Sequence, residues 1–522
     1  MSVEENSVHN QFLHERRKWT RLAVAFAMVA MAGSSLAQPV DFAGATFVNK
    51  GLVGVARVPS NATDEFGETL GGFGSGMAMD LHSWRKARDG DYLGVLYMIP
   101  DRGWNTQGTT DFRGRLHHFD VILKPFYGAS TTAQNQLSLH YRSSVLFHQR
   151  AGAPTTGLDP SGVKPATPLF PDLPIGPNGH ISVDDEAVVY PGDGTVWVSE
   201  EYGPYIYHYK LDGGLLDVIR PPEAFIPMRR DSAGDLEENF SANSPPIGVT
   251  YNPSPGNPVS GRQNNQGFEG LALSPDRRML FVLLQSALIQ DLDPANIATT
   301  RRNTRLLAYD LRHYKPALVG EYVVQLPLYQ DQTTTQTRLL TAAQSELLAL
   351  NDHQFLVLAR DSSAGFTTSN AASVYRSVDL IDISEATNIA GSAYDQPGQS
   401  VAPLGVLNGS VKPVAYQRFL NINDNTELNR FGLHNGLPND ANDLYEKWES
   451  MAVVPVDDPE APDDYFLFVG SDNDFITQQG FMAGEPYQDA SGNNVDTLVL
   501  VYRVSLPTYV RPRQFDFPGQ SR

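Results

Sequence analysis

Residues 186–201, with the sequence EAVVYPGDGTVWVSEE, contain the unit on which the fold depends. It consists of a carboxylate, a short apolar strand, a glycine-rich turn, a second apolar strand and then charged residues. The same order recurs in residues 269–285, 346–361 and 449–472, and a weaker copy without the leading glutamate occupies residues 75–102. Recurrence of one small unit along a chain is the mark of a repeat architecture.

Each copy is followed by further runs rich in β-branched and aromatic residues, bounded by Gly, Pro and Asp. Such runs predict strands, and strands that arrive in fours predict propeller blades. We therefore predict an all-β chain that folds into a single β-propeller of four-stranded blades. Five repeats are visible, and the long loops leave room for five to seven blades. A two-sheet sandwich is the structural alternative, but it does not explain the repeat.

Both ends of the chain carry a strand-like run that belongs to no complete copy of the repeat. Residues 497–506 follow the last copy as a third strand, and residues 47–58 offer a spare strand near the N-terminus. Pairing of these two segments would complete the last blade and close the ring. Closure would also remove the exposed strand edges that a linear array would leave.

The N-terminus has the layout of a secretory signal. Basic residues at positions 16–21 precede an apolar run at 22–32, and a small-x-small pattern ends at Ala37. We expect residues 1–37 to be removed and residues 38–522 to form a secreted, extracellular propeller domain with no membrane contact. The apolar run is too short to span a bilayer. An uncleaved signal anchor is the alternative, because the stretch before Arg16 is long.

Composition excludes several classes of function. The chain has a formal net charge of −20 and no cysteine. Nucleic acid is therefore not expected as a partner, since binding it requires a basic face. Disulfides, thiolate metal sites and cysteine nucleophiles are excluded as well. We expect a monomer, with glycosylation in a eukaryotic host at the sequons that begin at Asn61, Asn239 and Asn408.

The repeat places its charges at one end of the propeller. The first two strands of each copy run antiparallel, so the start of the first and the end of the second share one end. The first strand of a blade lines the central channel. One mouth of the channel is therefore predicted to collect the following side chains: Asp101, Arg102, Glu186, Glu200, Glu201, Glu269, Gln285, Glu346, Arg360, Asp361, Glu449, Asp472 and Asp474.

So many carboxylates require protons, arginine partners or a metal cation to lie close together. An all-oxygen set favours a divalent cation, above all Ca²⁺. The candidate metal ligands are Asp101, Glu186, Glu269, Glu346, Asp361, Glu449 and Asp472. The structural alternative is that a carboxylate repeated in every blade caps backbone N–H groups or pairs with an arginine of the next blade.

Several long motifs resemble a known family of secreted proteins, the phytase-like or esterase-like-activity-of-phytase family, and its fungal branch in particular. They include PDRGWN at 100–105, VSEEYGP at 198–204, GRQNNQGFEG at 261–270, YEKWES at 445–450 and SDNDF at 471–475. The resemblance covers residues 45–506. It implies a propeller fold, secretion and hydrolysis of phosphate esters, but it assigns no catalytic residue.

Three functions remain open on the sequence alone. The first is a Ca²⁺-dependent phosphoesterase for a small ester substrate, in which Arg102, Arg262 and Arg360 clamp phosphate oxygens and Glu201 or Glu269 acts as general base. The second is another metal-dependent esterase or lactonase on the same scaffold. The third is a non-catalytic binding propeller whose ring of carboxylates is structural.

Overall fold

The structure of the chain, a computed structural model, describes residues 38–332 and 338–512. Strands dominate these residues, and the α-helices among them are the short segments α2 (Ile297–Thr300) and α3 (Asn425–Leu428). None of the helices in the described part is long and apolar enough to cross a membrane. The expected signal, residues 1–37, lies outside the described residues.

Four of the large sheets are antiparallel meanders of four strands, and each begins with one copy of the repeat. The first contains β3 (Gly76–Lys86), β4 (Tyr92–Ile99), β5 (Arg115–Leu123) and β6 (Leu137–Leu146). The second contains β9 (Asp185–Val189), β10 (Thr195–Glu200), β11 (Ile206–Lys210) and β12 (Leu215–Ile219). The third contains β15 (Phe268–Leu273), β16 (Met279–Leu284), β17 (Asn303–Asp310) and β18 (Ala317–Gln325). The fourth contains β21 (Ala343–Ala349), β22 (Gln354–Arg360), β23 (Arg376–Asp382) and β24 (Ala415–Asn421).

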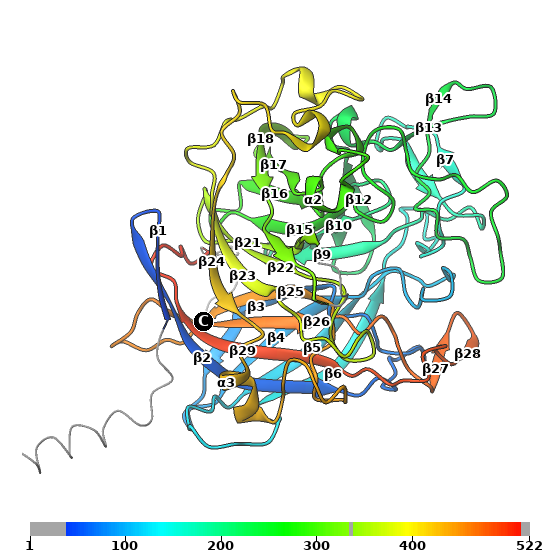
Figure 1. The fold of residues 1–522 in the computed structure, drawn as a ribbon. Helices are drawn as coiled ribbons and strands as arrows, with labels where there is room; N and C mark the ends of the chain where they lie inside the picture. The colour runs from blue at the N-terminus through cyan, green and yellow to red at the C-terminus, as the bar shows by residue number, and fades with distance from the viewer. Residues whose placement is uncertain (1–37, 333–337, 513–522) are drawn as a thin grey trace, which may run out of the picture.

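The fifth sheet joins the two ends of the chain. Its order is β25 (Trp448–Pro455), β26 (Asp464–Ser471), β29 (Thr497–Ser505), β2 (Ala45–Val58) and β1 (Gln38–Phe42). β2 runs antiparallel to β29, with Val55 opposite Leu500, and the two lie side by side in Figure 1. The predicted closure of the last blade by both chain ends is therefore confirmed, and β1 adds one outer strand that was not expected.

The sheets form a closed ring of five blades. The innermost strands contact one another in the cyclic order β3, β9, β15, β21, β25 and back to β3. Their backbones approach so closely that a Cβ on Gly270 would lie 2.6 Å from the backbone nitrogen of Leu347 in the next blade. The predicted β-propeller is thus confirmed, with the lowest of the expected blade numbers.

The smaller elements all lie in the loops between the blade strands. The short hairpins are β7 (Gly162–Lys164) with β8 (Leu173–Ile175), β13 (Met228–Arg230) with β14 (Leu236–Glu238), β19 (Leu328–Gln330) with β20 (Leu339–Thr341), and β27 (Gly480–Met482) with β28 (Glu485–Tyr487). The 3₁₀ turns are η1 (Glu223–Phe225), η2 (Ile289–Asp291), η3 (Ala393–Asp395), η4 (Pro403–Gly405) and η5 (Asn429–Phe431).

The hydrophobic core is divided into layers between neighbouring blades. Along β29, Leu500 points toward the fourth blade and packs in a cluster with Leu358, whereas Val499 points toward the first blade and packs in a cluster with Met98. This alternation follows from the two-residue period of a strand, which sends successive side chains to opposite faces of a sheet. Each blade is therefore apolar on both faces, and burial between blades stabilises the ring.

We expect the Leu500→Ala substitution to lower the free energy of unfolding by about 2–5 kcal/mol, since it deletes a fully buried side chain and leaves a cavity between two blades. Urea unfolding followed by tryptophan fluorescence measures the effect. The exposed Val319 in β18 provides the control, because Val319→Ala should change stability by less than about 0.5 kcal/mol. Equal effects of the two substitutions would contradict the layered core.

Candidate functional site

The inner strands and their partners bring their charged residues to one mouth of the channel, as predicted. In the fifth blade, Trp448 at the start of β25 lies opposite Ser471 at the end of β26. In the third blade, Phe268 at the start of β15 lies opposite Leu284 at the end of β16. Residues just before the inner strands and just after their partners therefore meet at one end.

A β-bulge at the start of an inner strand sets which side chain enters the mouth. In β15 and β25 the extra residue is the glutamate itself, Glu269 or Glu449. In β21 the extra residue is Ser345, so Glu346 is shifted one position along the strand. Because a one-residue shift sends a side chain to a different place on the sheet, Glu346 leaves the mouth.

Glu346 instead lies inside the channel, among the inner strands. Its Oε1 accepts the backbone N–H groups of Leu347 and Leu271, at 2.8 Å and 3.3 Å. It also lines a cavity of about 140 Å³ together with apolar side chains such as Met77, Leu271 and Met451 and polar ones such as His82 and Ser274. Glu346 therefore does not lie beside Arg360 at the mouth as expected, and its carboxylate caps one backbone N–H group of its own blade and one of a neighbouring blade.

One group of three buried carboxylates forms the clearest candidate cation site. Asp184, Glu186 and Glu201 each offer one oxygen, and these oxygens all lie within 4.8 Å of one another. The backbone N–H of Gly267 donates to Glu201 Oε1 at 2.8 Å and holds that side chain in place. No hydrogen bond to the Glu186 side chain is formed by the described residues.

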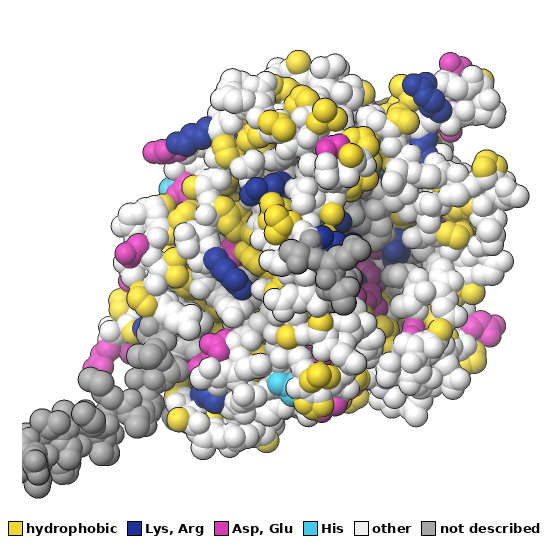
Figure 2. Space-filling view, viewed as in Figure 1, with side chains coloured by type: hydrophobic (Ala, Val, Ile, Leu, Met, Phe, Trp, Pro, Cys, Tyr) yellow, Lys and Arg dark blue, Asp and Glu magenta, His cyan; other side chains and the backbone are white. Residues whose placement is uncertain are grey.

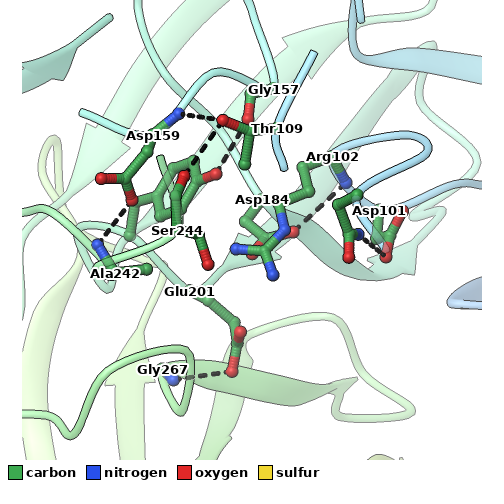
Figure 3. A network of polar contacts seen from close by, with 12 residues as sticks. Asp101, Arg102, Thr109, Gly157, Asp159, Asp184, Glu201, Ala242, Ser244 and Gly267 are labelled. Atoms are coloured by element: carbon green, nitrogen blue, oxygen red, sulfur yellow. Dashed lines mark hydrogen bonds and ion pairs between the residues drawn. The ribbon is translucent and has the colours of Figure 1, made fainter. Parts of the chain in front are cut away.

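Arg102 lies at the edge of this group. Its backbone N–H donates to Asp184 Oδ1 at 3.2 Å, and its Nη1 lies 3.1 Å from Asp184 Oδ2 (Figure 3). The ion pair is not aligned as a hydrogen bond, and Nε and Nη1 of Arg102 have no hydrogen-bond partner among the described residues. Nη1 is thus engaged by the ion pair with Asp184, and Nε is left for a further acceptor.

A second group of carboxylates surrounds Lys447, the residue directly before β25. Lys447 Nζ lies 2.7 Å from Asp472 Oδ2, 2.9 Å from Asp474 Oδ1, 3.4 Å from Glu449 Oε2 and 3.6 Å from Asp101 Oδ2. Burial opposes the positive charge, but the surrounding carboxylates outweigh it and raise the pKa of Lys447 well above its usual value. An ammonium ion tied to the chain thus neutralises part of this group.

The remaining mouth residues lie between these two groups. Arg360 Nη2 donates to Glu449 Oε1 at 2.5 Å, while its Nε donates to Ser345 and its Nη1 to Ser362. Gln285 donates to Glu269 Oε1, and Glu269 Oε2 is buried without a hydrogen-bond partner in the described part of the chain. The pairing of Arg360 with Glu449 of the next blade matches the structural alternative for that glutamate.

Burial shifts the titration of these carboxylates upward. Desolvation raises the pKa of Asp184 to about 6 and that of Asp101 to about 7, against the pull of Arg102 and Lys447. Desolvation and the neighbouring carboxylates raise the pKa values of Glu186 and Glu269 well above the usual range. The carboxylates at the mouth therefore outnumber its own cations, and full ionisation would require a further cation.

The predicted site residues fall into two sets. The mouth brings together Asp101, Arg102, Glu186, Glu201, Glu269, Arg360, Glu449 and Asp472. Arg262 and Asp361 instead secure loops: Arg262 donates to the backbone carbonyls of Tyr202 and Phe240, and Asp361 accepts from Ser373, Val374 and Tyr375. Their hydrogen-bonding groups are engaged with the protein, which leaves them poorly placed to bind a substrate or a metal.

Two central residues were missed from the sequence. Asp184 lies two positions before the repeated glutamate of its copy, and Lys447 lies two positions before that of the last copy. Neither position recurs between copies, so a search by repeat does not find them. A signal for Lys447 was present in the YEKWES motif, where a cation stands between two glutamates.

The fold and the site together define a five-bladed β-propeller with a carboxylate-rich site at one end of its channel. In the space-filling view, acidic side chains are visible inside a hollow of the surface (Figure 2). The chain belongs to the Phytase-like family, described as esterase-like activity of phytase, whose model matches residues 69–475.

Among the proteins similar to this chain are a curated relative and a solved structure. A protein from Arthroderma benhamiae, described as an uncharacterized secreted protein, is 41% identical over 464 residues, which cover 83% of this chain and 88% of the relative. A luciferin-regenerating enzyme is 12% identical, with 84% of this chain and 92% of that chain covered at a TM-score of 0.25. At this TM-score and identity, the likeness indicates nothing about the function of this chain.

Proposed function

We propose that the protein is a secreted, divalent-cation-dependent hydrolase of small phosphate esters, with Ca²⁺ as the cation. The observation that carries the proposal is the buried group of Asp184, Glu186 and Glu201, whose ligand atoms converge beside Arg102, a cation with an Nε that has no hydrogen-bond partner in the described residues. The family description, esterase-like activity of phytase, agrees with hydrolysis of an ester. Secretion of the Arthroderma benhamiae relative agrees with export.

The donor set fits a hard cation. Ca²⁺ binds oxygen ligands at about 2.3–2.6 Å, so two oxygens on one ion lie at most about 5 Å apart. The three oxygens of Asp184, Glu186 and Glu201 satisfy this limit. A second observation that points to a cation here is Glu269 Oε2, which is buried, has no hydrogen-bond partner in the described residues, and belongs to the carboxylate whose charge most affects Glu186.

The residues of the chain can divide the work of ester hydrolysis. A bound divalent cation supplies a Lewis acid that polarises the phosphoryl group and lowers the pKa of a coordinated water. Arg102, which pairs with Asp184 through Nη1, would bind a phosphate oxygen through Nε, which has no hydrogen-bond partner in the described structure. Glu269, through its unpartnered Oε2, would exchange a proton with the attacking water or the leaving group.

Hydrolysis of a carboxyl ester or lactone is the second candidate. It is favoured by the charge of the mouth, where carboxylates outnumber Arg102, Arg360 and Lys447 and would repel a highly anionic substrate. A neutral ester avoids this repulsion. A non-catalytic binding propeller, the third possibility, predicts no turnover of either substrate.

The test is an assay of the purified secreted protein with p-nitrophenyl phosphate, p-nitrophenyl acetate and a γ-lactone, each in EDTA and in Ca²⁺. We expect Ca²⁺-dependent release from the phosphate ester that EDTA abolishes. Activity on the acetate or lactone alone would replace the phosphoesterase by an esterase or lactonase. Absence of turnover on all three substrates with Ca²⁺, Mg²⁺ and Mn²⁺ would reject the hydrolase.

A further inference from the structure

The mouth of the channel contains two carboxylate groups of the same geometry. Asp101, Asp472 and Asp474 bring one oxygen each to within 4.8 Å of one another, just as Asp184, Glu186 and Glu201 do. By distance and ligand chemistry, either group matches what a divalent cation requires. The difference between them lies in what occupies the centre of each group.

The ammonium of Lys447 lies at the centre of the group formed by Asp101, Asp472 and Asp474. It is within 3.6 Å of an oxygen from each of Asp101, Asp472 and Asp474, and the Lys447 side chain is 18% exposed. Glu449 contributes a fourth oxygen at 3.4 Å. An ammonium placed among several carboxylate oxygens supplies one of the two positive charges that a divalent ion would bring, and it cannot dissociate from the chain.

The group of Asp184, Glu186 and Glu201 has no such central cation among the described residues. Arg102 contacts it from one side, through Asp184 alone. The positive charge of Lys447 also acts on Asp184 and Glu201 of this group. The mouth thus contains one carboxylate group with a lysine ammonium at its centre and one group without a central cation, close enough to interact electrostatically.

We propose that the ammonium of Lys447 takes the place of a divalent ion among Asp101, Asp472 and Asp474, so that the protein binds one divalent ion and not two. Asp101, Asp472 and Asp474 then form a latent divalent-cation site that the lysine ammonium blocks. This inference deepens the proposed function, since it sets the metal content of the same mouth, but its test does not depend on turnover.

Local structure explains why this lysine can fill the position. Lys447 immediately precedes β25, and the backbone N–H of Asp472 donates to the Lys447 carbonyl at 3.0 Å. That bond joins Lys447 to the end of the neighbouring strand β26. Asp472 and Asp474 lie in the loop that follows this strand. The register of the fifth blade therefore fixes the backbone of Lys447 beside Asp472, and the ion pairs hold its ammonium in the group.

The test is the stoichiometry of Ca²⁺ binding in the Lys447→Ala variant, measured by equilibrium dialysis at free Ca²⁺ up to about 1 mM, the range of extracellular calcium modules. We expect one more Ca²⁺ per chain than in the unmodified protein. Addition of Asp472→Asn to this variant should remove the extra ion. Lys447→Arg, which keeps the positive charge, and Lys412→Ala, at an exposed surface pair with Glu385, should leave the stoichiometry unchanged.

An equal number of bound ions in a folded Lys447→Ala protein would overturn the proposal. If the variant does not fold in EDTA, the proposal predicts that it refolds when Ca²⁺ is added, because the ion replaces the lost ammonium, and failure of Ca²⁺ to restore folding would also overturn it. A count of zero in the unmodified protein and one in the variant would support the role of Lys447 while rejecting the cation site of the proposed function.

Discussion

Replacing Glu186 by Gln is expected to lower kcat/KM for a phosphate ester at least about 100-fold in the presence of Ca²⁺. Substitution of a residue that only orients a metal ligand typically costs 10–100-fold, and Glu186 is placed as a ligand itself. Gln keeps the size of the side chain but removes the charge that would hold the ion. The same variant should lose most of the Ca²⁺-dependent rise in thermal stability, since a ligand stabilises the folded state only as far as it binds.

Glu346→Gln is the matched control for this prediction. Glu346 is also a buried glutamate of an inner strand, but it accepts backbone N–H groups inside the channel and lies outside the cation group. Its variant should keep both the Ca²⁺ shift and the catalytic rate. Unchanged kcat/KM and an unchanged Ca²⁺ shift in Glu186→Gln would reject Asp184, Glu186 and Glu201 as the cation site.

In EDTA, the protein is expected to lose stability as the pH rises from about 5 to 8. Burial raises the pKa values of Asp101 to about 7, Asp184 to about 6 and Glu446 to about 7 in the folded state. A carboxyl group with a raised folded-state pKa binds its proton more tightly in the folded than in the unfolded chain. Its contribution is therefore complete below the unfolded pKa near 4 and is lost as the pH passes through 6 and 7.

The size of this effect follows from the shifts. Each pKa unit corresponds to about 1.4 kcal/mol, so the groups at the mouth together are expected to change the free energy of unfolding by on the order of 3 kcal/mol or more. Urea unfolding at pH 5, 6, 7 and 8 measures it, in EDTA and in Ca²⁺. Ca²⁺ should stabilise the protein most at pH 8, where the carboxylates are ionised and need a cation.

The variant Asp101→Asn tests whether the carboxyl groups of the mouth, and not those elsewhere in the protein, cause this pH dependence. It removes one of the groups with a raised pKa, so its stability in EDTA should fall less steeply with pH than that of the unmodified chain. Stability that rises between pH 5 and 8 in EDTA, or that Ca²⁺ improves equally at all four pH values, would contradict the explanation.

Much of the architecture could be predicted from the chain because the repeat encodes it. The unit that begins at Glu186 recurs often enough to define the blades, and the segments at the two ends, now β2 and β29, were left to pair with each other and complete the last blade. Strand pairing of this kind depends on apolar pattern and turn chemistry, both of which are local in sequence. The blade number stayed open, because long loops look the same whether or not they contain another blade.

The site was predicted less completely, since its details depend on register and on contacts between blades. The β-bulge in β21 places Ser345 at the mouth and Glu346 inside the channel. In the sequence, the segment that begins at Glu346 looks equivalent to the one that begins at Glu269. Lys447 and Asp184 belong to no repeated position, so their meeting with the repeated carboxylates becomes visible when the blades are assembled.

The sequence by itself determined the class of fold, the closure of the ring and the end of the channel at which the charges gather. These follow from strand period, turn residues and antiparallel pairing, which act over short stretches of chain. The tertiary structure decided which charges neutralise one another, which carboxylates cap backbone groups and which group stays open to a cation. Electrostatic partners are chosen by distance in space, and side chains such as Asp101 and Lys447 come within 3.6 Å only after the first and last blades close the ring.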